Sequence, residues 1–161
     1  MKTKKKKRIV IVRRKRKVPL MKNGITVEAR LEKLDEVQAF VDGELEKNDC
    51  PAKARYQIAL AVEEIFVNIA SYAYAPEDGT GGTADISISF GGEQVTAEIV
   101  FSDRGKPFDP TAKEDADTSP DALLEREGGL GILMTKKLMD GVTYSRVDGK
   151  NVLTVRKKLG S

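Results

Sequence analysis

The stretch Glu63-Glu64-Ile65-Phe66-Val67-Asn68 lies within residues 56–74, the run of this chain with the strongest helical pattern. Apolar residues recur there at helical spacing and predict one buried stripe, formed by Ile58, Val62, Ile65 and Ile69. Glu64 and Asn68 are also four residues apart, so their side chains share a face away from that stripe. An unpaired carboxylate in a buried setting is costly, which indicates a ligand, a metal ion or water beside the pair. Taken alone, the pair also fits an exposed helix surface.

The composition is that of a folded domain with a charged surface. The chain has 161 residues, of which 40% are hydrophobic and 33% are charged, enough for one domain with a real core. The net charge of +3 is unevenly spread, because residues 1–24 hold 12 of the 28 Lys and Arg residues and no acid. The remainder has 16 basic and 25 acidic residues, a net charge of −9. We therefore expect a basic leader, residues 1–23, before an acidic domain, residues 24–161.

The basic leader has three open interpretations. A block of like charges is usually solvated, but it also attracts nucleic acid or an anionic membrane surface. The third interpretation is that Met21 is the true start of the protein. The acidic body argues against nucleic-acid contact by the domain itself. The apolar residues 9–12 are too few for a signal peptide, and no apolar run is long enough to span a membrane, so we expect a cytoplasmic protein.

Two residue types are absent or nearly so. The chain has no histidine, and Cys50 is its one cysteine. This composition excludes Cys/His zinc sites, Ser-His-Asp triads and a phosphate-accepting histidine in the chain. A general base near neutral pH must therefore be a carboxylate or a perturbed lysine. A lone thiol fits a reducing compartment, and we expect Cys50 to be buried as a small hydrophobic residue.

The order of predicted elements indicates an α+β fold. Strands are expected at residues 25–27, 84–90, 95–101, 142–146 and 152–157, and helices at 31–47, 51–74 and 129–140. Gly91-Gly92 and Asp148-Gly149 predict hairpin turns, and residues 102–128 form a long loop of the kind that is functional or mobile. We expect a two-layer α/β sandwich, with helices on one face of a mixed, mainly antiparallel sheet.

Two further clusters carry polar chemistry. The first is Ser102-Asp103-Arg104-Gly105-Lys106-Pro107-Phe108-Asp109, directly after a predicted strand. Asp103 could accept a hydrogen bond from an exocyclic amine, and Gly105 permits close approach of the backbone, although the pattern is also typical of a plain turn. The second is Gly128-Gly129-Leu130-Gly131-Ile132, which opens a helix. Free N–H groups and the helix dipole make such a start a phosphate site, although glycine clusters also serve as flexible joints.

In this order, the three motifs resemble those of the GHKL ATP-binding fold (the Bergerat fold) shared by gyrase, Hsp90, histidine kinases and MutL. Glu-x-x-x-Asn on the first motif's helix is similar to the N box of that family. Asp-x-Gly-x-Pro-Phe-Asp from Asp103 is similar to its G1 box, and Gly-Gly-Leu-Gly-Ile to its G2 box. The short chain and residues 128–159 look most similar to the anti-sigma factor serine/threonine kinases of bacterial partner-switching systems. The resemblance covers residues 25–159.

This resemblance implies roles for individual residues. Asn68 would hold the Mg²⁺ that bridges the ATP phosphates, and Glu64 would be the general base. Asp103 would bind the adenine amino group. The other expected nucleotide-binding residues are Gly105 and Pro107, which would shape the adenine pocket, and Gly129, Leu130 and Gly131, which would border the phosphates. Residues 110–127 would be the ATP lid.

The function implied by the resemblance is that of an ATP-dependent serine/threonine protein kinase acting as an anti-sigma factor. It would bind a sigma factor, phosphorylate a STAS-type antagonist of the anti-sigma factor, and form a homodimer. The alternative is a nucleotide-gated module that captures or releases a protein partner without useful phosphate transfer. Two features depart from the family pattern: Tyr72, where many relatives have a histidine four residues after the N-box asparagine, and the basic leader.

Overall fold

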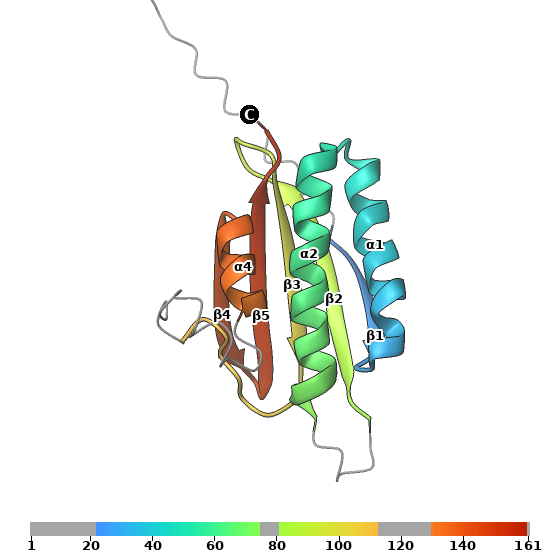
Figure 1. Ribbon diagram of the computed structural model, residues 1–161, viewed down its shortest axis with the longest axis vertical. Helices are drawn as coiled ribbons and strands as arrows, with labels where there is room; N and C mark the ends of the chain where they lie inside the picture. The colour runs from blue at the N-terminus through green and yellow to red at the C-terminus, as the bar shows by residue number, and fades with distance from the viewer. Residues whose placement is uncertain (1–21, 75–80, 113–129, 161) are drawn as a thin grey trace, which may run out of the picture.

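The computed structural model describes residues 22–74, 81–112 and 130–160. In chain order its elements are β1 (Asn23–Glu28), a 3-10 helix η1 (Leu31–Lys33), α1 (Leu34–Lys47), α2 (Ala52–Asn68), a π-helix η2 (Ile69–Ala73), β2 (Thr83–Gly91), β3 (Thr96–Asp103), α4 (Leu130–Leu138), β4 (Gly141–Val147) and β5 (Lys150–Lys158). The strands form one sheet in the order β1-β2-β3-β5-β4, and each described pairing is antiparallel. Among the described residues, the α-helices α1, α2 and α4 cover one face of this sheet (Figure 1). The predicted α+β sandwich is confirmed.

The core lies between α2 and the covered face of the sheet. Burial alternates along β3, so that every second residue faces the helices: Ala97, Ile99, Phe101 and Asp103. The predicted stripe of α2 meets this face, and Ile58, Val62 and Ile65 are each at most 2% exposed. Burying one such side chain contributes about 2 kcal/mol. Cys50 is buried in the same core, as predicted.

The hairpin of β4 and β5 brings a distant part of the chain to the end of β3. Asp148 and Gly149 both have positive φ angles, of 50° and 76°, which matches the two-residue turn that suits the twist of a hairpin. This predicted turn is confirmed and sets the register of β5. Because β5 also pairs with β3, Asn151 lies directly opposite Asp103.

The segment predicted as one helix over residues 51–74 has two parts. Regular α-helical structure ends at Asn68 and continues as the π-helix η2. Tyr74, just beyond η2, donates a hydrogen bond from its hydroxyl to the carbonyl of Thr83 (2.6 Å) and accepts one from the N–H of Arg104 (2.9 Å). Burial raises the pKa of Tyr74, so the hydroxyl keeps the proton that it donates. These bonds fix the end of the helix against the ends of β2 and β3.

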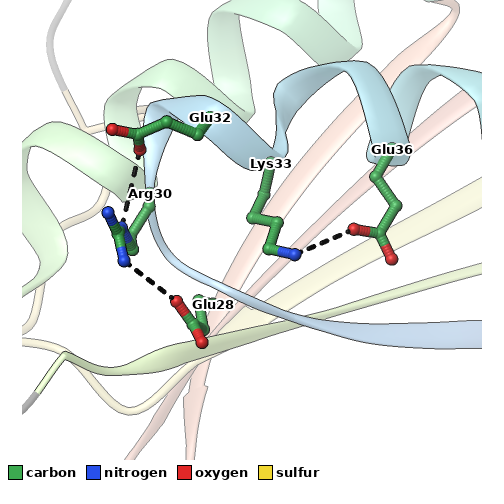
Figure 2. A network of polar contacts seen from close by, with 5 residues as sticks. All are labelled: Glu28, Arg30, Glu32, Lys33 and Glu36. Atoms are coloured by element: carbon green, nitrogen blue, oxygen red, sulfur yellow. Dashed lines mark hydrogen bonds and ion pairs between the residues drawn. The ribbon is translucent and has the colours of Figure 1, made fainter.

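The surface at the start of α1 is charged and solvated. Arg30 lies between Glu28 (3.4 Å) and Glu32 (3.5 Å), and Lys33 pairs with Glu36 (3.3 Å) (Figure 2). All five side chains are at least 40% exposed. Exposed pairs of this kind contribute less than about 1 kcal/mol each. In the part of the chain that the structure describes, no helix is long and apolar enough to cross a membrane.

Candidate functional site

A pocket opens between the helix layer and the sheet, where α2 continues into η2. It contains about 480 Å³ of empty space, its open mouth included. The helices contribute Ile65, Asn68, Ile69, Tyr72, Ala73 and Ile132 to its wall. The strands and the segment after β3 contribute Phe101, Asp103, Lys106, Phe108, Pro110, Tyr144, Asn151 and Leu153. Most of the wall is apolar, and a few polar groups interrupt it.

Asp103 supplies one of these polar groups. It is the last inward-facing residue of β3 and is only 6% exposed. Its Oδ1 accepts hydrogen bonds from the N–H of Gly105 (2.9 Å) and from Nδ2 of Asn151 (3.0 Å). Oδ2 receives no hydrogen bond from any described residue. Because no described side-chain oxygen is both fully buried and unpaired, Oδ2 remains open to solvent as an acceptor for a donor group of a ligand.

Gly105 brings the turn after β3 into contact with the end of η2. A Cβ atom on this glycine would lie 2.2 Å from the carbonyl oxygen of Ala73. The next residue, Lys106, donates its backbone N–H to the same oxygen (2.9 Å). The close approach expected at Gly105 is therefore an approach to the helix backbone. The turn is held at a fixed distance from the residues that follow Asn68.

Gly105 and Pro107 were expected to shape an adenine pocket, and neither belongs to the wall of this pocket. Gly105 is buried behind the wall, and Pro107 is exposed. The wall in this region is formed by the neighbouring residues Phe108 and Pro110. Phe108 is 42% exposed, so an apolar ring lies at the pocket and remains available to a ligand.

Asn68 lies in the pocket wall, one helical turn from Glu64. Its half-buried side-chain amide makes no hydrogen bond with another described residue, so its oxygen is available as a ligand. Glu64 is also half-buried, but it is outside the pocket wall. Its carboxylate lies against α4, where a Cβ atom on Gly131 would be 1.7 Å from Oε2. The structure therefore brings Glu64 and Gly131 together beside the pocket.

The remaining predicted residues are only partly described. Leu130 is the first residue of α4. Gly129 and residues 113–127 of the expected lid lie outside the described residues. The structure thus places α4 beside α2 (Figure 1), with Leu130 and Gly131 of the predicted glycine motif in its first turn.

The polar network behind Asp103 was missed from the sequence. It centres on Asn151, which is 6% exposed and donates to Oδ1 of Asp103. Oδ1 of Asn151 accepts hydrogen bonds from the Tyr144 hydroxyl (2.5 Å) and from Nη1 of Arg146 (3.0 Å). A polar residue two positions before the inward-facing apolar residues Leu153 and Val155 of β5 was the available signal. Its significance depends on the pairing of two strands far apart in the sequence.

Comparisons with known proteins identify the family and agree with the fold. Residues 27–157 match the histidine kinase-like ATPase domain family. The chain is 32% identical over 106 residues to the serine-protein kinase RsbW of Bacillus licheniformis, a stretch that covers 63% of each protein. It is 27% identical over 104 residues to the serine/threonine-protein kinase BtrW of Bordetella bronchiseptica, which covers 65% of this chain and 70% of that protein. The chain therefore spans less than two thirds of the Bacillus relative's length.

A solved structure shares the fold. The crystal structure of the RsbU and RsbW domains of a Mycobacterium tuberculosis protein superimposes with a TM-score of 0.60 at 17% identity, over 86% of this chain and 32% of that chain. The expected resemblance to the GHKL ATPases, and among them to serine/threonine kinases, is confirmed by these matches. The pocket between helix and sheet, bordered by Asn68 and Asp103, lies within the matched region. The chain belongs to the histidine kinase-like ATPase domain family.

Proposed function

We propose that this chain is an ATP-dependent serine/threonine protein kinase that acts as an anti-sigma regulatory factor. In this proposal it binds a sigma factor, phosphorylates a STAS-type antagonist protein and works as a homodimer in the cytoplasm, where these partners act. The observation that carries the proposal is the free Oδ2 of Asp103 in a pocket that also presents Asn68. The names of the relatives, serine and serine/threonine protein kinases, support the same chemistry.

The pocket suits an adenine base. Apolar side chains such as Ile65, Phe101 and Leu153 line it and would cover the faces of a flat ring. Oδ2 of Asp103 would accept a hydrogen bond from the exocyclic amino group. An ionised carboxylate accepts hydrogen bonds and donates none, so it disfavours a base that carries a carbonyl at that position. The geometry therefore favours adenine over hypoxanthine and guanine.

The available donor groups suit Mg²⁺ that is shared with phosphates. The described residues contain no group of three or more acidic, cysteine or histidine side chains that could hold a metal ion. Asn68 offers one neutral oxygen, and Mg²⁺ commonly binds through one or two protein oxygens together with water and substrate phosphates. Bound Mg²⁺ would supply charge neutralisation at the phosphates. The role of Asn68 would be to hold it at the helix end of the pocket.

The proposed general base is Glu64. A carboxylate near the transferred phosphate could accept the proton of a serine hydroxyl, and Glu64 is one turn from Asn68. In this structure, however, its carboxylate lies against Gly131 and outside the pocket wall. Kinase chemistry therefore requires the transferred phosphate to lie at the start of α4, beside this carboxylate. The same observation favours the second candidate function, a nucleotide-gated module that captures or releases a protein partner.

One experiment separates the two candidates. The chain is incubated with Mg²⁺, radiolabelled ATP and a STAS protein encoded near it, while nucleotide affinity is measured by calorimetry. We expect the wild type to label a serine of the STAS protein. Asn68→Ala should lose both Mg·ATP binding and transfer, and Glu64→Gln should keep binding but lose transfer. Glu63→Gln changes an exposed carboxylate on the same helix and is the matched control.

The outcomes have distinct meanings. ATP binding by the wild type with no transfer to the STAS protein would select the binding module. Transfer at the wild-type rate by Glu64→Gln would reject this residue as the base. Loss of transfer in the Glu63→Gln control would show that the assay reports damage to the helix and not the chemistry of one carboxylate.

A further inference from the structure

Two polar side chains occupy the inward-facing positions at one end of the neighbouring strands β3 and β5. Asp103 on β3 and Asn151 on β5 are directly opposite in the register, and each is 6% exposed. The other inward-facing residues are apolar: Ala97, Ile99 and Phe101 precede Asp103 on β3, and Leu153 and Val155 follow Asn151 on β5. A buried carboxylate can bind a ligand reproducibly only if its neighbours fix its orientation. The neighbour in position to do so is Asn151.

Asn151 has no hydrogen-bonding capacity left for a ligand. Its Nδ2 group has two protons, and it donates to Oδ1 of Asp103 (3.0 Å) and to the carbonyl of Lys106 (2.9 Å). Its Oδ1 accepts from Tyr144, from Arg146 and from the N–H of residue 108. All of these partners belong to the protein. Asn151 therefore acts on pocket chemistry only through Asp103 and the adjoining turn.

Arg146 anchors the network on the side away from Asp103. Its Nη1 donates to Oδ1 of Asn151 (3.0 Å) and to the carbonyl of Gly105 (2.9 Å). One guanidinium group thus connects the edge strand β4, the strand β5 and the turn after β3. No carboxylate among the described residues forms an ion pair with Arg146. Its Nη1 group is committed to fixing this wall of the pocket.

We propose that Asn151, held in place by Arg146, is a positioning residue for adenine recognition. By donating to Oδ1 of Asp103, it fixes the rotation of that carboxylate and leaves Oδ2 as the acceptor that faces the ligand. The identity of the ligand rests on the proposed function, whereas the network is a property of the protein without nucleotide.

The substitution Asn151→Asp tests this role with almost no change in shape. It replaces the Nδ2 donor by an oxygen beside Oδ1 of Asp103. When both carboxyl groups are ionised they repel each other, and when they share one proton the donated hydrogen bond is restored. On the other side, the Arg146 guanidinium and the Tyr144 hydroxyl both donate, so the shared proton lies toward Asp103. Nucleotide binding should therefore become dependent on pH.

Binding of Mg·ATP is measured by calorimetry at pH 5.5, 7 and 8. We expect Asn151→Asp to bind about tenfold more weakly than the wild type at pH 8 and to approach the wild-type affinity at pH 5.5. The matched control is Asn48→Asp, the same chemical change at an exposed position at the end of α1. Its affinity relative to the wild type should not change with pH. Circular dichroism at each pH establishes that every variant is folded.

A second measurement needs no nucleotide. Carbon-13 NMR of the Asp103 carboxyl group should show a titration at higher pH in Asn151→Asp than in the wild type. Wild-type affinity of folded Asn151→Asp at pH 8 would overturn the inference, and so would a loss of affinity that is equal at every pH. Absence of ATP binding by the wild type would instead overturn the proposed function, and the NMR titration would still decide whether Asn151 controls Asp103.

Discussion

Gly131 and Glu64 lie so close together that a Cβ atom on the glycine would be 1.7 Å from Oε2 of the glutamate. The carboxylate of α2 fills the space that the missing side chain of α4 leaves open. The two helices thus meet at the point where the N-box and G2-box motifs of the family come together. A methyl group added at Gly131 acts directly on the position of the proposed base.

We predict that Gly131→Ala lowers the rate of phosphate transfer without lowering the stability of the fold. Alanine is favoured over glycine inside a helix by about 1 kcal/mol, and the atom it meets is the flexible end of a side chain. The melting temperature should therefore not fall. Displacement of the Glu64 carboxylate should lower the rate of transfer to the STAS protein by more than about tenfold.

The control for this prediction is Gly43→Ala in α1, where a Cβ atom would meet nothing within 4 Å. It should raise the melting temperature and leave transfer unchanged. If Gly131→Ala transferred phosphate at the wild-type rate, the contact between Gly131 and Glu64 would have no part in the chemistry.

Gly105→Ala should damage both the fold and the pocket. Its Cβ atom would be 2.2 Å from the carbonyl oxygen of Ala73, and a backbone atom cannot turn aside. The hydrogen bond from Lys106 to that oxygen would be lost, and unfolding in urea should show a destabilisation of about 2 kcal/mol. Gly81→Ala, which adds a methyl group in open space, should change stability by less than about 0.5 kcal/mol. Equal stabilities of the two variants would contradict this account of the turn.

The free Oδ2 of Asp103 predicts discrimination between ATP and ITP, which has a carbonyl in place of the amino group. The wild type should bind ITP more weakly by a factor on the order of 10 to 100, because a carbonyl facing a carboxylate leaves both groups unpaired. Asp103→Asn should bind ATP more weakly and reduce the ratio between the two nucleotides. Competition of each nucleotide against fluorescent ADP measures the ratio. Equal affinity of the wild type for ATP and ITP would exclude this orientation of the base.

The hydrogen bonds of the Glu44 carboxyl group predict that the free energy of unfolding depends on pH. Hydrogen bonds from Lys47 and Asn23 hold the pKa of this buried carboxyl group below its ordinary value of 4.5. The stabilisation is therefore fully present above pH 4.5 and is lost as the pH falls through the lowered pKa. Glu44→Gln should reduce the free energy of unfolding by about 1 kcal/mol at pH 7, and the difference should shrink below pH 4.5. The exposed Glu46→Gln is the control, and a difference that persisted unchanged at pH 3 would contradict the prediction.

The features that were predictable from the sequence are those encoded within a few residues. The stripe of Ile58, Val62 and Ile65 was predictable from helical spacing. The turn at Asp148-Gly149 was predictable because these residue types tolerate the positive φ angles that a two-residue hairpin turn requires. The resemblance to the GHKL family predicted which residues to seek, and the structure brings Asn68 and Asp103 into one pocket. Their roles toward a nucleotide stay predictions.

What was missed depends on contacts across long stretches of chain. The position of Asn151 opposite Asp103 is set by the register of β3 and β5, and no local pattern specifies that register. The spacing of apolar residues that predicts an α-helix, with 3.6 residues per turn, does not reveal the π-helix after Asn68. The course of the turn after β3 was also hidden: Gly105 packs against the backbone of Ala73, and Phe108 and Pro110 line the pocket whereas Pro107 does not.

The interior place of β5 in the sheet, between β3 and β4, has a consequence for synthesis. On a ribosome, the helix with Asn68 and the strand with Asp103 emerge first, and β5 follows much later. Until β5 has paired with β3, a nascent chain lacks both the partner of Asp103 and one wall of the pocket. A truncated product that ends before residue 150 would lack Asn151 and Leu153 of the pocket wall, and nucleotide would stabilise it less. Ligand binding would thus distinguish chains that include β5 from chains that stop before it, because this strand completes the wall of the pocket.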